Sequence, residues 1–394
     1  MPNIPVILLT GFLGSGKTTL LNEMLRSPEF EDTALIINEF GEIALDHDLV
    51  VHDDDRLMVS SSGCICCQAR SDLSTSLGEI LCRMLTDEIP APKRIIIETT
   101  GLADPIPIIG ELLRIAERPV LRSKKLGAIS FSLHTVVTLV SAVTGELDIE
   151  GHLEALKQAA VADTILISKA DLAADPASRA DLSRLKQSLM KINPACRLLD
   201  KQDGNFQPSM LLGQSAYDPG ALSEDASAWL GAETFAILQH PGDHPHHPNR
   251  HGDRVRAHSF EFDEPITINA LRAFLLRACR ELGERLLRLK GIINMEDDRA
   301  RPVTIHAVRS DHSPIVRLER WPSRVQRSRL VLIVQDEPEN AVAELVADLR
   351  AGYTRPAPGI WLTLATVASG MTALAALITF LLHAITGSLA SAIG

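Results

Sequence analysis

Short apolar runs alternate with amphipathic segments through the first half of the chain. The apolar runs are rich in Val, Ile and Leu, and they occupy residues 4–9, 34–37, 94–97, 136–140 and 164–167. Most lack polar alternation, which is typical of strands covered on both faces. Helical patterns lie between several of them, at residues 18–26, 71–85 and 153–162. Strands that alternate with helices predict a doubly wound, mostly parallel α/β sheet.

The pattern changes after about residue 200. Residues 203–227 are rich in Gly, Pro, Ser and Asp and are interpreted as a linker or a loosely ordered segment. Strand patterns at 257–262, 291–294, 304–308 and 330–334, with helical patterns at 268–282 and 340–350, predict a second, smaller α+β domain. We therefore divide the chain into a sheet domain at 1–200, a linker with a histidine-rich stretch at 201–256, a second domain at 257–350 and an apolar tail at 356–394.

Composition narrows the class of protein. The formal net charge of −11 argues against a general nucleic-acid binder, because the phosphate backbone favours a basic face. Six cysteines in 394 residues make no disulfide framework. The first residues have no basic region before the apolar run at 4–9, so we expect a cytoplasmic protein with reduced thiols.

The sequence GFLGSGKT at residues 11–18 fits the phosphate-binding pattern G-x-x-x-x-G-K-[ST] and joins a predicted strand to a predicted helix. Its glycines let backbone N–H groups surround phosphate oxygens, and the helix N-terminus adds positive potential. We expect Lys17 to contact the β- and γ-phosphates and Thr18 to bind Mg²⁺ through its hydroxyl. The residues predicted to contact the nucleotide here are Gly11, Gly14, Ser15, Gly16, Lys17, Thr18 and Thr19.

The sequence ETTG at residues 98–101 follows the predicted strand at 94–97. The Glu98 carboxylate is a candidate neighbour of Mg²⁺ and the attacking water, and the Gly101 N–H is a candidate contact of the γ-phosphate. With Lys17 and Thr18, Glu98 completes the predicted catalytic set, although carboxylates at 39 and 42 compete for the role of positioning water. Asp104, a few residues on, is interpreted as structural.

The sequence SKAD at residues 168–171 follows the predicted strand at 164–167 and is similar to the Asn-Lys-x-Asp base-reading motif of GTPases. A carboxylate at Asp171 would accept the N1–H and N2–H of guanine, a pair that adenine lacks. Ser168 stands where the motif usually has Asn, and Lys169 keeps the motif's lysine. GTP is therefore the expected nucleotide.

Three cysteines within four residues, Cys64, Cys66 and Cys67, form a C-x-C-C motif. Thiolates at this spacing suit a soft metal such as Zn²⁺, Co²⁺ or Cu(I). Three sulfurs leave a fourth position for water or a carboxylate, and Glu39 and Glu42 are the candidates. An incomplete or mixed shell suits transfer of a metal better than permanent storage.

The other cysteines and the histidines are less specific. Cys82, Cys196 and Cys279 stand alone and are expected to be core residues. Six histidines within residues 240–258 either collect metal on a flexible arm or form a solvated polar loop.

Together these motifs resemble the CobW-type metallochaperone GTPases of the SIMIBI class of P-loop proteins. The matching sequences are GFLGSGKTTL at 11–20, NEFGE at 38–42, GCICC at 63–67, ETTGLADP at 98–105, SKAD at 168–171, RLKGII at 288–293 and RSRLVLIV at 327–334. The resemblance covers about residues 4–336 and includes the His-rich stretch between the domains.

The resemblance implies a GTPase that inserts a metal, most often zinc, into client proteins. It implies metal ligands at Cys64, Cys66 and Cys67, with Glu42 or Glu39 as the acidic partner. Hydrolysis of GTP would relax the segment near NEFGE and loosen or expose the metal, because the γ-phosphate and Mg²⁺ hold such loops.

Two features depart from the family pattern. The family usually has an acid where this chain has Ser141, which removes a carboxylate near the nucleotide. The second departure is the tail, where residues 360–385 form an apolar run longer than the ~20 residues that cross a bilayer as a helix. Trp361 suits an interfacial anchor. A single membrane anchor at the inner face of a membrane is predicted, with a packing or oligomerising helix as the alternative.

The sequence thus predicts a GTP-hydrolysing metal chaperone that uses GTP, Mg²⁺ and Zn²⁺, with a client metalloprotein as its partner and no nucleic acid. One alternative is a protein that handles Co²⁺ in cobalamin synthesis or nitrile hydratase maturation. The other is a nucleotide-binding metal buffer or membrane scaffold without useful turnover. The motifs do not indicate the client or the oligomeric state.

Overall fold

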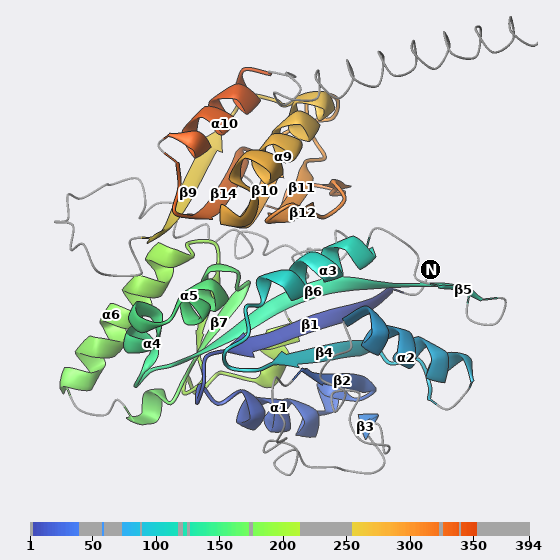
Figure 1. The fold of residues 1–394 in the computed structure, drawn as a ribbon, viewed down its shortest axis with the longest axis vertical. Helices are drawn as coiled ribbons and strands as arrows, with labels where there is room; N and C mark the ends of the chain where they lie inside the picture. Colours follow the sequence, from blue (N-terminus) through green and yellow to red (C-terminus); the bar gives the residue numbers. More distant parts are fainter. Residues whose placement is uncertain are drawn as a thin grey trace, which may run out of the picture.

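The computed structural model contains two sheets, each with helices packed on it (Figure 1). The residues that it describes are 3–38, 57–58, 73–86, 89–116, 121–123, 127–172, 176–212, 254–322, 326–338 and 340–352. The first sheet is doubly wound and mostly parallel, and the second belongs to a smaller α+β unit, so the predicted fold class is confirmed. The apolar C-terminal helix predicted within residues 356–394 lies outside the described residues.

The first sheet has eight strands in the order β3-β2-β4-β1-β6-β7-β8, with β5 paired to β6. Among the strands that the structure describes, only the β5–β6 pair is antiparallel. The strands are β1 (Asn3–Gly11), β2 (Thr33–Asn38), β3 (Leu57–Met58), β4 (Arg94–Thr99), β5 (Leu121–Ser123), β6 (Gly127–Ser141), β7 (Thr164–Ser168) and β8 (Arg197–Asp200).

Helices cover both faces of this sheet (Figure 1). They are α1 (Lys17–Arg26), α2 (Leu73–Leu85), α3 (Ile106–Ala116), α4 (Gly145–Gly151), α5 (Leu153–Ala160) and α6 (Pro176–Ile192), with short 3₁₀ turns η1 (Pro28–Phe30), η3 (Ala170–Leu172) and η4 (Pro208–Leu212). Alternate residues of β1 face opposite layers, as the period of a strand requires. Ile7 and Leu9 pack with α1, whereas Val6 and Leu8 pack in the larger core that contains α3 and α5.

Part of the segment predicted as a linker packs against the first domain. Residues 203–212 are ordered, and η4 places Leu211 at 1% exposure against the α1 side of the sheet. The high content of Gly, Pro and Ser around it concealed this short apolar anchor.

The second sheet has six strands in the order β12-β11-β10-β14-β9, with β13 paired to β11, and every pair is antiparallel. Its strands are β9 (Val255–Phe262), β10 (Leu286–Ile293), β11 (Val303–Val308), β12 (Asp311–His312), β13 (Val316–Arg317) and β14 (Ser328–Gln335). Its helices are α9 (Ile268–Leu282) and α10 (Ala341–Arg350), with the 3₁₀ turn η7 (Gly283–Arg285).

The two faces of the second sheet have different partners. Helices α9 and α10 cover the outer face, and the inner face turns toward the first domain (Figure 1). Along β14, Leu330 and Leu332 pack under the helices, while Val331 and Ile333 join the apolar core of the first domain. Burial of both faces of this sheet therefore ties the two domains together.

A buried charge cluster lies in the same interface. Asp163 accepts hydrogen bonds from Arg288, from Lys290 at 3.3 Å and from the Val136 N–H at 2.9 Å. Burial by itself raises the pKa of Asp163, but the charges of Arg288 and Lys290 outweigh it and hold that pKa below its usual value. Burial also lowers the pKa of Lys290 to about 8.

No helix within the described ranges is long and apolar enough to cross a membrane. The apolar run at 360–385, with Trp361, belongs to the part of the chain that the structure does not describe.

Candidate functional site

The loop GFLGSGKT lies between β1 and α1, as its pattern predicts. Gly11, Gly14 and Gly16 all have positive φ, at 146°, 69° and 93°, so this backbone path strongly favours glycine. A Cβ on Gly11 would lie 2.5 Å from the Leu139 carbonyl oxygen, whereas a Cβ on Gly14 or Gly16 would meet nothing within 4 Å. The loop is thus packed against β6 on one side and open on the other.

The first turn of α1 faces this loop. Gly16 is the N-cap of α1 and has no side chain that could accept a hydrogen bond from the first turn. That turn consists of Lys17, Thr18 and Thr19. The Lys17 ammonium donates to the carbonyl oxygens of Gly11 at 2.8 Å and Phe12 at 3.3 Å. It therefore folds back over the loop, where a phosphate would need a positive charge.

Glu98 and Gly101 lie beside the loop at the end of β4. Glu98 pairs in register with Leu9 of β1 and is only 6% exposed. A Cβ on Gly101 would lie 2.7 Å from the backbone nitrogen of Leu13, so glycine permits a close backbone approach here. The backbone just after β4 therefore lies directly against the phosphate-binding loop.

Ser168, at the end of β7, contacts the same loop from the other side. Its hydroxyl donates to the Ser15 carbonyl oxygen at 2.6 Å. Lys169 follows in a left-handed conformation with φ of 58°, and Asp171 lies in η3. The Asp171 carboxylate accepts a hydrogen bond from Gln202 at 3.0 Å, so the loop after β8 adjoins this segment.

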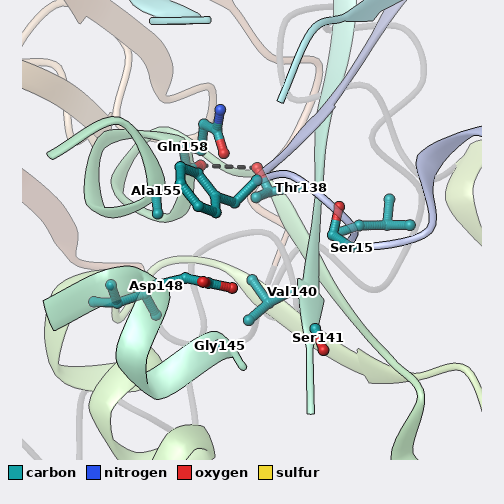
Figure 2. Close-up of a pocket in the computed structure, with 11 residues that line it drawn as sticks. Ser15, Thr138, Val140, Ser141, Gly145, Asp148, Ala155 and Gln158 are labelled. Carbon is teal, nitrogen blue, oxygen red and sulfur yellow. Dashed lines mark hydrogen bonds between the residues drawn. The ribbon is translucent and has the colours of Figure 1, made fainter. Parts of the chain in front are cut away.

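A small pocket lies between the phosphate-binding loop, the end of β6 and helices α4 and α5. Figure 2 shows Ser15 on one side of it and Ala155 and Gln158 of α5 on the other. Ser15 Oγ and Gln158 Oε1 are buried and have no hydrogen-bond partner within the described residues. A buried donor and acceptor beside the loop are suited to an additional polar ligand or water.

Ser141, which replaces the acid usual in the resembled family, has a local structural role. Its hydroxyl oxygen accepts hydrogen bonds from the N–H groups of Val143 at 3.2 Å and Thr144 at 3.3 Å. These bonds shape the turn that leads into α4.

The predicted metal ligands Cys64, Cys66, Cys67, Glu39 and Glu42 lie outside the described residues, as does the His-rich stretch at 240–258 apart from its last residues. Among the residues that the structure does describe, no group of three or more His, Cys, Asp or Glu side chains is placed to hold a metal. The described strand β2 ends at Asn38, immediately before Glu39, and Asn38 pairs with Thr99 of β4. The chain thus enters the predicted metal-binding segment beside the end of β4.

The three isolated cysteines differ from one another. Cys196 and Cys279 are buried as predicted, and burial raises the pKa of their thiols to about 12 and about 11. The core prediction for Cys82 is wrong, because this side chain is exposed on α2. The apolar face of α2 is formed by Leu77, Leu81 and neighbours one turn apart, and position 82 lies off that face.

Sequence reasoning missed two side chains that support the site. Gln158 donates to the carbonyl oxygens of Gly101 at 3.1 Å and Ala103 at 3.0 Å. Arg309 of the second domain donates to Asp104 at 3.2 Å. The Asp-Pro pair at 104–105, before an apolar helical pattern, indicates the start of a helix. No local sequence pattern indicates which distant residues contact it.

Comparison with known families matches both halves of the chain. A family model described as the CobW/HypB/UreG nucleotide-binding domain matches residues 5–200. A second model, described as the cobalamin synthesis protein cobW C-terminal domain, matches residues 255–350.

Two of the relatives that are named as zinc chaperones align with most of this chain. The zinc chaperone YjiA of Escherichia coli strain K12 is 28% identical over 351 residues, which span 89% of this chain and all of the relative. The zinc chaperone CobW of Pseudomonas aeruginosa is 28% identical over 315 residues, covering 74% of this chain and 77% of the relative. A solved structure of Zn(II)-bound YjiA GTPase from E. coli superimposes with a TM-score of 0.61 at 26% identity, covering 89% of this chain and 99% of that one.

Proposed function

The chain belongs to the CobW family of P-loop nucleotide-binding proteins, and on that premise we propose that it is a GTPase that delivers zinc to client metalloproteins. The observation that carries the proposal is the geometry of the glycine loop, with Lys17 folded over it and Gly101 in contact with it. Similarity to relatives named as zinc chaperones, over the full length of one and 77% of the other, supports zinc as the cargo.

GTP hydrolysis follows from how this site would hold phosphates. In this proposal the backbone N–H groups of the loop and the Lys17 ammonium, which lies 2.8 Å from the Gly11 carbonyl oxygen, would contact the β- and γ-phosphates. In the same proposal the Thr18 hydroxyl, in the first turn of α1, and the Glu98 carboxylate, near the end of β4, would supply the oxygen ligands that Mg²⁺ prefers. When bound there, Mg²⁺ neutralises charge on the phosphate oxygens.

Selectivity for guanine is assigned to the segment after β7. Asp171 lies in η3 with its carboxylate accepting from Gln202, and Ser168 fixes the segment to the phosphate-binding loop. In this arrangement Asp171 reads the guanine N1–H and N2–H, while Ser168 and Lys169 set its distance from the phosphates.

Zinc is the cargo in this proposal, held by Cys64, Cys66 and Cys67 with Glu39 or Glu42. Thiolate ligands with one open or exchangeable position suit a metal that must leave again. Strand β2 pairs with β4 and ends immediately before Glu39. A change of the nucleotide contacts at Gly101, just after β4, would therefore act close to the start of the metal-binding segment. Co²⁺ as the cargo remains the alternative for this ligand set.

The experiment uses the full chain and compares it with the Lys17→Ala and Cys66→Ala variants. We expect the parent and Cys66→Ala to hydrolyse GTP and Lys17→Ala not to. We expect the parent and Lys17→Ala to bind one zinc tightly and Cys66→Ala not to. If the parent does not hydrolyse GTP in the presence of zinc and a client, the GTPase proposal fails and the alternative of a metal buffer is favoured. Tight Co²⁺ with weak zinc would indicate cobalt handling.

Membrane attachment through residues 360–385 remains a prediction of the sequence. Flotation of the full chain and of a chain truncated after residue 355 with phospholipid vesicles tests it. Only the full chain should float if the tail is an anchor.

A further inference from the structure

The segment from Gly101 to Asp104 is held in place by α5. Gln158 is 1% exposed, and its amide nitrogen donates to the carbonyl oxygens of Gly101 at 3.1 Å and Ala103 at 3.0 Å. The next residue back on the same helix, Lys157, forms an ion pair with Asp104 at 2.8 Å. Because Gly101 contacts the phosphate-binding loop, the segment links that loop to the side chains that contact Asp104.

Asp104 is the junction of these contacts. One carboxylate oxygen accepts the Ile106 N–H at 3.0 Å and so caps the start of α3. The other accepts from Lys157 at 2.8 Å and from Arg309 at 3.2 Å. Arg309 comes from the second domain, 205 residues further along the chain.

Arg309, which contacts Asp104, has an unusual backbone conformation. Its φ is 52°, in the left-handed region that residues with a side chain rarely adopt. Its N–H donates to the Leu286 carbonyl oxygen at 2.7 Å, and its guanidinium lies 3.0 Å from the Glu284 carboxylate. The turn between β11 and β12 thus holds a long cationic side chain where a glycine or asparagine is usual.

The same turn also docks on α3. Asp311 pairs with Arg114 at 2.7 Å, and a Cβ on Gly110 would lie 2.6 Å from the Asp311 carboxylate. Glycine at 110 therefore permits the close approach of the turn to the helix. With Arg309 at the start of α3 and Asp311 further along it, the second domain contacts the helix at two points.

We propose that Arg309 is a positioning residue for GTP hydrolysis, by which the C-terminal domain holds Asp104 and the Gly101 segment against the phosphate-binding loop. The inference rests on the proposed GTPase function and adds a role for the second domain in it. Among the described residues, Arg309 forms hydrogen bonds or ion pairs with Asp104, Glu284 and Leu286, none of which belongs to the phosphate-binding loop. Its effect passes through Asp104, so it should alter turnover more than nucleotide affinity.

Three variants test this role. Arg309→Ala removes the contact, Arg309→Lys keeps a charge at the same place, and Arg254→Ala removes a C-terminal-domain ion pair, to Asp336, remote from the nucleotide. We expect Arg309→Ala to lower kcat for GTP by roughly 3- to 10-fold, which is about 1 kcal/mol of barrier, with KM and GDP affinity changed less than about twofold. Arg309→Lys should recover part of the loss, and Arg254→Ala should match the parent.

Hydrogen exchange provides a readout independent of turnover. With bound GDP and with a non-hydrolysable GTP analogue, Arg309→Ala should speed exchange of amides in residues 101–110 and leave those of β1 unchanged. Unaltered kcat and exchange in Arg309→Ala, or equal losses in Arg254→Ala, would overturn the proposal. If the parent lacks turnover but Arg309→Ala still loosens residues 101–110, the GTPase function fails while the positioning contact stands.

Discussion

Ser168 and Ser15 are joined by a hydrogen bond in which the Ser168 hydroxyl donates to the Ser15 carbonyl oxygen at 2.6 Å. Ser168 stands where GTPase base-reading motifs usually have Asn, and it retains a side-chain donor to the phosphate-binding loop. The bond joins β7, which carries the base-reading segment, to the loop between β1 and α1. The departure from the usual motif therefore preserves a link between the two halves of the nucleotide site.

Loss of this link should weaken nucleotide binding. Ser168→Ala leaves the buried Ser15 carbonyl without its Ser168 donor, which costs about 1 kcal/mol or roughly fivefold in affinity. Fluorescence titration with labelled GDP and GTP measures it. Ser168→Asn, which restores a donor amide, serves as the control and should bind within about twofold of the parent. Equal affinities for Ser168→Ala and the parent would show that the bond has no part in binding.

Gly101→Ala should impair the site through sterics. Its Cβ would lie 2.7 Å from the Leu13 nitrogen and 2.8 Å from the Leu13 Cα, both backbone atoms that cannot move without shifting the phosphate-binding loop. We expect at least a tenfold loss of kcat/KM for GTP, about 1.4 kcal/mol or more.

Gly78→Ala is the matched control for that substitution. A Cβ at this position in α2 meets nothing within 4 Å, so the change should leave GTP turnover unaltered and stabilise the helix by about 1 kcal/mol. Similar kinetic losses in both variants would contradict the steric account of Gly101.

The interdomain charge cluster should make Arg288 important for stability. Arg288→Met leaves Asp163 buried with Lys290 as its remaining cationic partner, and breaking a buried pair typically costs about 3–5 kcal/mol. Urea unfolding measures the loss. The double variant Asp163→Asn with Arg288→Met removes both charges and should lose less than the two single variants added together. Strict additivity would argue against a direct pair.

The low pKa of Lys290 predicts a pH dependence of stability. Its folded pKa is about 8 against an ordinary value of 10.5, because burial disfavours the charged ammonium. Between these values the unfolded chain binds more protons, so the contribution of Lys290 to stability rises as the pH increases from about 8 to about 10.5. The difference in unfolding free energy between the parent and Lys290→Met should therefore shift in favour of the parent across that range. A difference that stays flat would rule out the depressed pKa.

The main strands could be predicted because they are covered on both faces and therefore form continuous apolar runs. The strand predicted at 136–140 extends back to Gly127, and this extension was missed. Its first part alternates, with Ile129, Phe131 and Leu133 buried and Ser130 and Ser132 half-buried, so it lacks the continuous run that marks the other strands.

Contacts between distant residues could not be predicted in the same way. The glycine loop and the segment after β7 are local patterns, and their residues meet at the carboxyl edge of the sheet. Asp104, by contrast, was interpreted only as a structural residue, because its partner Arg309 lies in the other domain. Only packing of the second sheet on the first domain brings these two side chains together.

Zinc affinity measured with GDP·Mg²⁺ and with a non-hydrolysable GTP analogue and Mg²⁺ tests the coupling of the two motifs most directly. The account predicts one zinc per chain, lost in Cys66→Ala, with an affinity that differs by tenfold or more, about 1.4 kcal/mol, between the two nucleotides. Equal zinc affinity in both states would contradict it, because a nucleotide without differential effect on the metal site cannot drive release of the metal.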